Sequence, residues 1–164
     1  MKNDDMRRQL VQLGNGAHAL ATQMLGSTED AADAVHDAFT TVLRQPQAFN
    51  PGKGSLRSWF IRVVHNRCID QLRRRRSGSA ELGDLVDPGP GPEQSLELEQ
   101  RDQALHRALG QLRNEQRQII VLRDYMDMSY AEIADVLDIL QGTVMSRLHR
   151  ARLALKEELT RHVK

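Results

Sequence analysis

Apolar residues recur every three or four positions in several stretches of the chain, and polar residues fill the positions between them. The first such stretch follows Ser27, and its apolar positions share one helical face: Ala31, Val35, Ala38 and Val42. Ser27 or Thr28 can cap this helix, because acidic residues follow directly in its first turn. Pro46 predicts where the helix ends.

A second stretch predicts a long helix after the turn-rich segment from Asn50 to Gly54. Ser55 is its expected cap, and its apolar positions are Leu56, Trp59, Phe60, Val63, Ile69 and Leu72. Residues 57–76 hold seven arginines against one acidic residue, Asp70. The sequence therefore predicts a strongly basic helix that ends in the run from Arg73 to Arg76.

Four helices are predicted beyond residue 96. The first has the apolar positions Leu105, Ala108, Leu109 and Leu112. The second is expected to begin at a cap on Asn114 and to run through Tyr125, and Ser129 with Glu132 predicts a capping box for the third. The fourth spans about residues 141 to 162, and its apolar stripe contains Val144, Leu148, Ala151, Leu155 and Leu159.

Residues 77–95 are rich in Gly and Pro, hold several acidic residues and contain few apolar residues. This composition is typical of a flexible linker. Neither flanking half shows the alternation of a strand, and aromatic residues make up only 4% of the chain, which disfavours a β-sandwich. We therefore predict an all-α protein with two small helical domains, residues 1–76 and 96–164, joined by a flexible acidic linker.

The composition excludes several classes of protein. The 164 residues carry a net charge of +1, and the single cysteine, Cys68, allows no internal disulfide. Asp33 and Asp37 lie four residues apart, but no base, metal motif or glycine loop accompanies them, so we expect no enzyme, no metal and no cofactor. The N-terminus lacks an apolar run, and the longest aliphatic stretch is only residues 119–122, which favours a cytoplasmic protein without membrane insertion.

Residues 129–155 have the pattern of a helix-turn-helix. A short apolar-faced helix is followed by a tight turn at residues 138–140 and then by a helix that begins with small and polar residues. Side chains suited to base edges and phosphates share a second face of that last helix: Thr143, Ser146, Arg147 and Arg150. The alternative interpretation is a plain helical hairpin with solvated arginines.

The basic helix also has two interpretations. Its arginines, with Trp59 near its start, fit a nucleic-acid backbone and a base-stacking surface. Equally, Trp59 can belong to the core, and the arginines can simply be solvated. Composition alone does not decide between these alternatives.

Three segments, in this order, resemble the extracytoplasmic-function (ECF) sigma factors of the sigma-70 family. They are EDAADAVHDAFTTVLR (29–44), GSLRSWFIRVVHNRCIDQLRRRR (54–76) and ALGQLRNEQRQIIVLRDYMDMSYAEIADVLDILQGTVMSRLHRARLAL (108–155). The resemblance implies a sigma factor that binds core RNA polymerase and directs promoter-specific initiation, without being an enzyme. The first segment resembles the acidic helix that docks on the polymerase clamp, and its matching positions here are Asp33, His36 and Asp37.

The resemblance also assigns expected roles in promoter recognition. The loop 49–55 resembles a pocket for a flipped minus-ten base, and four residues would support melted DNA: Trp59, Asn66, Arg73 and Arg74. The helix-turn-helix would read the minus-thirty-five element through Thr143, Ser146, Arg147 and Arg150. The family usually has Gly where this chain has Asp138, Pro or Ser where it has Leu140, and Lys where it has Met145.

Two further expectations follow from the resemblance. The free chain would pack its two domains together, or be held by an anti-sigma factor, so that the DNA-binding faces are hidden. The alternative function is a stand-alone helix-turn-helix transcriptional regulator, whose N-terminal half would serve dimerisation or an effector. Charge reversal on the acidic helix separates the two functions, because only a sigma factor needs that helix to bind polymerase.

Overall fold

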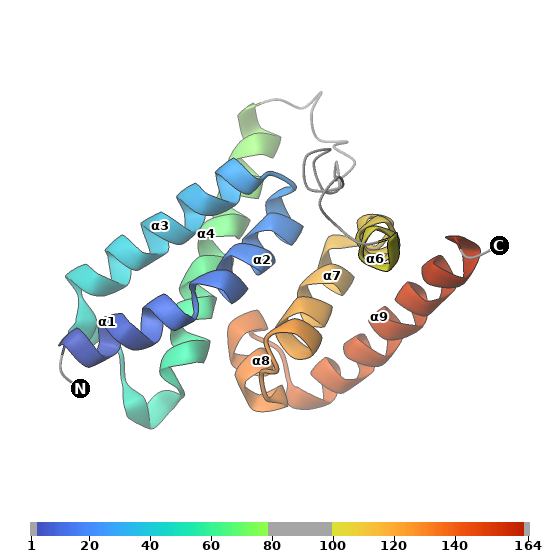
Figure 1. The fold of residues 1–164 in the computed structure, drawn as a ribbon. Coiled ribbons are helices and arrows are strands. Elements are labelled where there is room, and N and C mark those ends of the chain that lie inside the picture. Colours follow the sequence, from blue (N-terminus) through green and yellow to red (C-terminus); the bar gives the residue numbers. More distant parts are fainter. Residues whose placement is uncertain (1–2, 79–99, 163–164) are drawn as a thin grey trace.

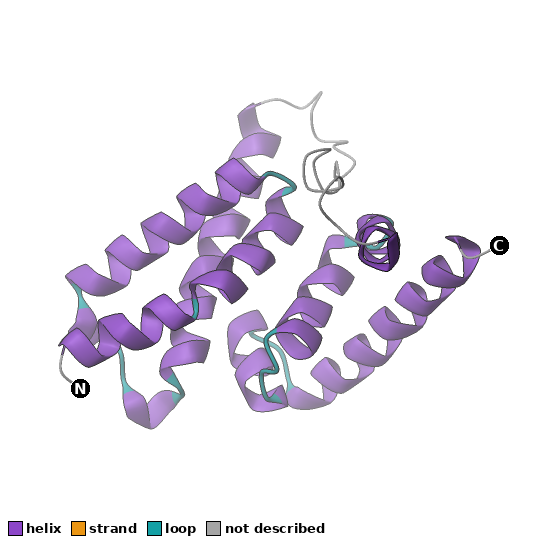
Figure 2. Cartoon of the chain, viewed as in Figure 1, coloured by secondary structure: helices purple, strands orange, loops and turns teal. Residues whose placement is uncertain are grey.

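The computed structural model describes residues 3–78 and 100–162 of the chain (Figure 1). Most of the segment predicted as a linker, residues 77–95, lies outside these ranges. Within them the chain forms only helices, turns and short loops, which confirms the all-α prediction (Figure 2). None of the described helices combines the length and the apolarity that crossing a membrane requires.

The first half contains α1 (Asn3–Gln12), α2 (Gly14–Leu25), α3 (Thr28–Arg44) and α4 (Leu56–Gly78), with short 3-10 turns at Pro46–Ala48 and Pro51–Lys53. The hydroxyl of Ser27 accepts a hydrogen bond from the Asp30 N–H at 3.2 Å, so Ser27, and not Thr28, is the cap of α3. Gly26 joins α2 to α3 in a left-handed conformation, with φ at 72°. The sequence pattern did not predict α1 and α2.

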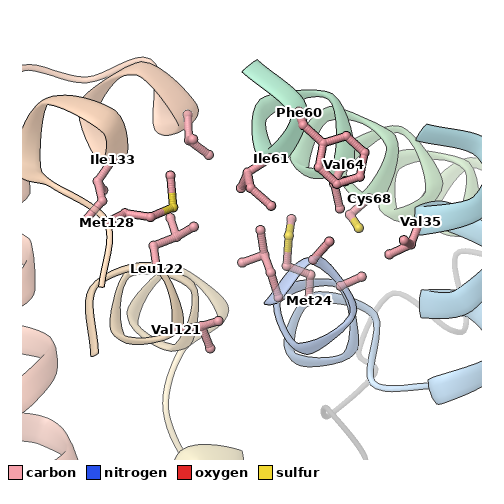
Figure 3. Close-up of a cluster of buried hydrophobic side chains, with 14 of the residues drawn as sticks. Met24, Val35, Phe60, Ile61, Val64, Cys68, Val121, Leu122, Met128 and Ile133 are labelled. Carbon is pink, nitrogen blue, oxygen red and sulfur yellow. The ribbon is translucent and has the colours of Figure 1, made fainter. Parts of the chain in front are cut away.

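The core of the first half lies between α2, α3 and α4. The predicted apolar face of α3 is buried in full: Ala31, Val35, Ala38 and Val42. Phe60 of α4 is completely buried and packs on Phe39 of α3, with ring centroids 4.8 Å apart. Ile61, Val64 and Cys68 continue this buried face of α4 (Figure 3).

The second half contains α6 (Gln100–Gly110), α7 (Asn114–Ile120), a π-helical turn (Val121–Tyr125), α8 (Tyr130–Leu137) and α9 (Gln141–His162). The prediction that Asn114 caps α7 is wrong, because Arg113 is the N-cap residue. The side-chain amide of Asn114 instead donates to the carbonyl of Met24 in α2, at 3.0 Å. Asn114 therefore makes a tertiary hydrogen bond with the first half in place of the predicted helix cap.

The helix-turn-helix has the predicted local chemistry. Ser129 and Glu132 form a reciprocal capping box, with hydrogen bonds of 3.1 and 3.0 Å between each side chain and the other residue's N–H. Asp138 ends α8 in the left-handed conformation, with φ at 57° and ψ at 51°. The apolar stripe of α9 faces the other helices, and Val144, Leu148 and Ala151 are fully or almost fully buried.

The two halves pack against each other in one continuous hydrophobic cluster. Helix α4 lies against α8, and α2 lies against α7 and the π-helical turn. Met24 and Ile61 face Leu122 and Met128 across this boundary (Figure 3). The packing of the halves agrees with one of the two expectations for the free chain.

A close approach at Gly16 of α2 adds a steric constraint to this boundary. A Cβ at Gly16 would lie 2.6 Å from the Cε atom of Met126, which belongs to the second half. Real Cβ atoms essentially never show such a distance, so a side chain at Gly16 would require the flexible side chain of Met126 to move.

Replacing Asp138 by Gly is expected to stabilise the protein. An L-residue in the left-handed region carries a steric penalty that Gly lacks, so we expect the free energy of unfolding to rise by about 0.5–1 kcal/mol. Urea denaturation measures the change. The control Ala131→Gly, at an exposed position inside α8, should lower stability by about 1 kcal/mol. Equal or lower stability for Asp138→Gly would contradict the role of strain at this turn.

Candidate nucleic-acid interface

The outer face of α4 aligns three of the predicted DNA-contacting residues. Trp59, Asn66 and Arg73 are spaced seven apart, so they lie on one side of the helix and span about 21 Å at 1.5 Å per residue. Asn66 and Arg73 are exposed, as is the adjacent Arg74, and Trp59 is half-buried. The structure thus gathers the predicted minus-ten residues on one surface of the first half.

The arginines of the basic helix, residues 57–76, make different kinds of contact, and the sequence alone did not distinguish them. Arg67 donates to the hydroxyl of Thr41 in α3 at 2.7 Å. Arg75 binds the carboxylate of Asp30 at 2.5 Å and the carbonyl of Leu25 at 3.0 Å. These two arginines hold α4 against its neighbours, whereas Arg73 makes only a 3.9 Å contact with a carboxylate one turn away.

A hollow of about 400 Å³ opens beside Trp59, where the loop 46–55 meets α4. The Trp59 ring packs on Phe49, with centroids 5.3 Å apart. Asn50 shapes the loop, because its side-chain oxygen accepts the Gly52 N–H at 2.9 Å. Loop residues that were predicted to form a base pocket, Lys53 among them, therefore line a concave site, and Arg62 and Asp135 line it from outside the loop.

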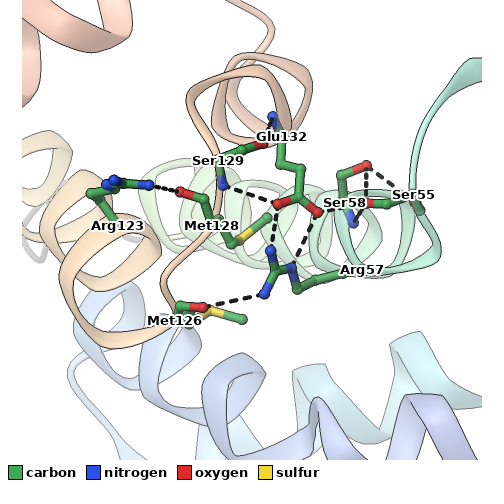
Figure 4. Close-up of polar contacts among 8 residues, drawn as sticks. All are labelled: Ser55, Arg57, Ser58, Arg123, Met126, Met128, Ser129 and Glu132. Carbon is green, nitrogen blue, oxygen red and sulfur yellow. Dashed lines mark hydrogen bonds and ion pairs between the residues drawn. The ribbon is translucent and has the colours of Figure 1, made fainter.

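An ion pair between the two halves lies next to this hollow (Figure 4). Arg57 of α4 donates to both carboxylate oxygens of Glu132 in α8, at 2.5 and 3.1 Å. The hydroxyl of Ser55 donates to the same carboxylate at 2.7 Å, and Arg57 also reaches the carbonyl of Met126 at 3.4 Å. The carboxylate that closes the capping box of α8 is therefore also the main polar anchor between the halves.

The surroundings of Glu132 change its acidity. Burial by itself would raise the pKa of Glu132, but the hydrogen bonds from Arg57, from the Ser129 N–H and from Ser55 outweigh burial and lower that pKa to about 2. The same contact with Glu132 raises the pKa of Arg57. Both partners are therefore charged throughout the physiological range.

The recognition helix of the helix-turn-helix keeps its predicted contact residues accessible. Ser146 and Arg150 are exposed, and Thr143 and Arg147 are half-buried. The expectation that packing of the halves hides the DNA-binding faces is therefore wrong for this face. It is wrong because the first half packs on α8, the first helix of the motif.

The three predicted polymerase-binding residues form an exposed patch on α3, and they are Asp33, His36 and Asp37. Figure 1 shows α3 on the side of the first half that faces away from α8 and α9. The packing of the two halves leaves this patch accessible.

Cys68 and His65 are the remaining residues whose chemistry the structure describes closely. Burial raises the pKa of Cys68 to about 12, so the thiol is unreactive at neutral pH. His65, three residues before Cys68, forms a 2.9 Å hydrogen bond with the side chain of Gln118 in α7. Residues 3–78 and 100–162 contain no cluster of His, Cys, Asp or Glu that could hold a metal ion.

The sequence pattern did not predict the polar contacts between the halves. The residues that make them include Ser55, Arg57, Arg62 and Asp135. Arg62 reaches Asp135 of α8 at 3.4 Å, 73 positions along the chain. The only sequence signal is the opposite charge of the basic helix and of the acidic residues in α8, and that signal does not specify a pairing.

Comparisons with known proteins agree with this geometry. Residues 10–78 match Sigma-70 region 2, and residues 102–155 match Sigma-70, region 4. The chain is 33% identical to the ECF RNA polymerase sigma factor SigE of Mycolicibacterium smegmatis over 92% of its own length and 60% of that protein. It is 36% identical to the ECF sigma factor SigM of Mycobacterium tuberculosis, over 84% of this chain and 68% of SigM.

A solved structure has the same arrangement of helices. The sigma factor RpoE from Bartonella quintana, crystallised in complex with the anti-sigma factor NepR, superposes with a TM-score of 0.79. The match covers 95% of this chain and 97% of that one, at 26% identity.

Replacing Glu132 by Gln tests the anchor between the halves. Because the pKa of Glu132 is lower in the folded state, its contribution to stability is complete above its usual pKa of 4.5 and is lost as pH falls toward about 2. We expect Glu132→Gln to lower the free energy of unfolding by about 1–2 kcal/mol at pH 7, and to weaken the pH dependence below pH 4.5.

Denaturation curves from pH 2 to 7 measure this effect. Glu157→Gln is the matched control, because Glu157 is an exposed carboxylate on α9, and we expect the wild-type pH dependence from it. A Glu132→Gln protein that keeps the full wild-type loss of stability between pH 4.5 and 2 would show that another carboxylate is responsible.

Proposed function

Because the chain belongs to the ECF RNA polymerase sigma factors of the sigma-70 family, we propose that its three exposed surfaces carry the successive contacts of transcription initiation. Sigma factors direct RNA polymerase to promoters and are not themselves enzymes. The observation that carries the proposal is the presence of both sigma regions in one chain, in the order of the family. A stand-alone regulator would need only region 4, which contains the helix-turn-helix.

We assign polymerase binding to Asp33, His36 and Asp37 on α3. These residues are exposed on a helix whose opposite face is fully committed to the core. An exposed acidic patch attracts a basic partner surface over a long range, which favours fast docking. Because the patch stays accessible while the halves are packed, polymerase can dock before they separate.

Minus-ten recognition and melting are assigned to the face of α4 and to the hollow beside it. Trp59 supplies an aromatic surface for a base, and Asn66 with Arg73 and Arg74 follows along the same helix. Unpairing a base costs a few kcal/mol, and a pocket that holds the flipped base offsets part of that cost. The exposed arginines would hold the backbone of the separated strand.

Minus-thirty-five recognition is assigned to Thr143, Ser146, Arg147 and Arg150. They lie in the first turns of α9, where a recognition helix presents side chains to base edges in the major groove. The N-cap carbonyl of Leu140 accepts the Val144 N–H at 3.0 Å, but its side chain offers no cap.

Domain boundaries, location and regulation complete the proposal. Residues 1–76 would form region 2 and residues 96–164 region 4, and residues 77–95, most of which lie outside the described residues, would connect them. We place the protein in the cytoplasm, where core RNA polymerase and promoter DNA are available. An anti-sigma factor is a further proposed partner, since the similar RpoE was crystallised with one.

Reversing the charge of the acidic patch should abolish polymerase binding. The double variant Asp33→Lys/Asp37→Lys exchanges attraction for repulsion on an exposed face and leaves the core intact. We expect wild-type protein to co-elute with bacterial core RNA polymerase on gel filtration, and the variant to lose at least tenfold in affinity, about 1.4 kcal/mol or more.

The exposed carboxylates Glu115 and Glu157 provide the control, as the matched variant Glu115→Lys/Glu157→Lys on the second half. This variant should co-elute like the wild type. If neither the wild type nor the variants bind polymerase while all of them bind duplex DNA, the chain is a stand-alone regulator instead.

Introducing a positive charge at Met145 should strengthen promoter binding. Met145 is 55% exposed on the recognition helix, at a position where the family usually has Lys. Met145→Lys adds one phosphate contact, so the slope of log K against log salt should steepen by about 0.9. Leu153→Lys, at an exposed apolar position farther along α9, is the control. Identical salt slopes for both variants and the wild type would place Met145 away from the DNA.

A further inference from the structure

The hollow beside Trp59 is completed by a side chain from the other half of the molecule. Asp135 of α8 lines it together with residues of the loop and of α4. One Asp135 oxygen lies 3.4 Å from Nη1 of Arg62, and the other lies 3.5 Å from the point that a Cβ on Gly54 would occupy. An acidic group therefore sits inside the site that we assign to a DNA base.

Asp135 lies beside Glu132, which is one helical turn closer to the start of α8. Residues three apart in a helix share a face, about 5–6 Å from each other. Glu132 accepts from the guanidinium group of Arg57 and the hydroxyl of Ser55 at the edge of the hollow (Figure 4). Asp135 accepts from the guanidinium group of Arg62. Guanidinium and hydroxyl donors of this kind are also the usual partners of DNA phosphates.

We propose that Glu132 and Asp135 act as an internal mimic of nucleic acid, so that helix α8 and a single DNA strand occupy the same site on the first half in turn. The inference rests on the proposed minus-ten role of that site and adds how the chain itself regulates it. In the packed form the carboxylates satisfy the arginines and Asp135 narrows the hollow. A strand gains these partners only after α8 has left.

This competition acts on one DNA-binding surface and not on the other. Ser146 and Arg150 on α9 stay exposed in the packed form, so duplex DNA can bind the recognition helix before the halves separate. A single strand instead binds only the separated fraction of molecules, and its apparent affinity is reduced by that fraction. The mimic thereby delays strand capture relative to duplex recognition.

Two variants are expected to weaken the contact between α8 and the first half, each by a different physical change. Asp135→Asn removes the charge facing Arg62 and preserves the shape of the side chain. Gly16→Leu changes no charge, and its whole side chain would enter the space that Met126 of the second half fills, so Met126 must shift and the boundary between the halves is loosened. Circular dichroism checks that both variants are folded.

Binding is followed with a single-stranded DNA probe and the full-length chain. The probe is a random-sequence pool of fluorescein-labelled 12-nucleotide DNA, and fluorescence anisotropy reports its affinity. Trp59 is the only tryptophan in the chain, so its quenching reports whether the probe reaches the hollow. We expect Asp135→Asn to bind the probe at least threefold more tightly than the wild type, and Gly16→Leu about tenfold more tightly.

Glu157→Gln makes the same change in net charge on an exposed part of α9, and we expect it to bind like the wild type. Adding Trp59→Ala to each releasing variant should remove most of the gain. Equal probe affinity for the wild type, Asp135→Asn and Gly16→Leu would overturn the mimic. If polymerase co-elution persists in that case, the proposed sigma function stands and only the mimic is wrong.

Discussion

The carboxylate of Glu132 is the group on which the arrangement of the molecule depends. It accepts the Ser129 N–H and so fixes the start of α8, and it accepts both arms of the Arg57 guanidinium from the other half. Its side chain is only 16% exposed. A largely buried ion pair adds little net stability over an apolar contact, but losing one partner is costly because it strands the other charge. The pair therefore specifies one orientation of α8 on α4.

Apolar contacts supply the attraction that this pair orients. Ile61 and Met24 meet Leu122 and Met128 in a seam that is continuous with both cores. Arg117 is 2% exposed within the seam, where it donates to carbonyls of Leu112 and, at 3.2 Å, of Gln23. Burial lowers the pKa of Arg117 to about 10, so it remains charged at neutral pH. Hydrogen bonding to carbonyls at the ends of α2 and α6 favours that charge. The boundary thus combines an apolar core with polar contacts that define its register.

Features decided within a few residues could be predicted from the sequence, and features decided across the boundary could not. The cap at Ser27, one of two candidates, the capping box at Ser129 and the turn that begins at residue 138 follow from local hydrogen bonding and sterics, and all three are confirmed. Asn114 was assigned as a cap on the same local grounds, but α2 offered it a different partner. Helix α2 escaped prediction because Gly14 and Gly16 weaken the helical signal, and the neighbour that a side chain at Gly16 would meet, Met126, belongs to the second half. The roles of the arginines likewise depend on partners far along the chain. The assigned contacts with DNA and polymerase stay predictions.

The way the halves pack leaves the two surfaces that we propose for DNA binding unequally accessible. The first helix of the helix-turn-helix is covered by α4, and its acidic side face points toward Arg57 and Arg62. The second helix keeps its N-terminal turns in solvent, with Met145 and Leu140 exposed at its tip. Because α8 makes the internal contacts and α9 carries the residues proposed for recognition, the motif can pack on the first half while α9 stays accessible. On the roles proposed for these surfaces, the energetic cost of separating the halves falls on the binding of a single strand at α4, and every contact that strengthens the boundary raises that cost.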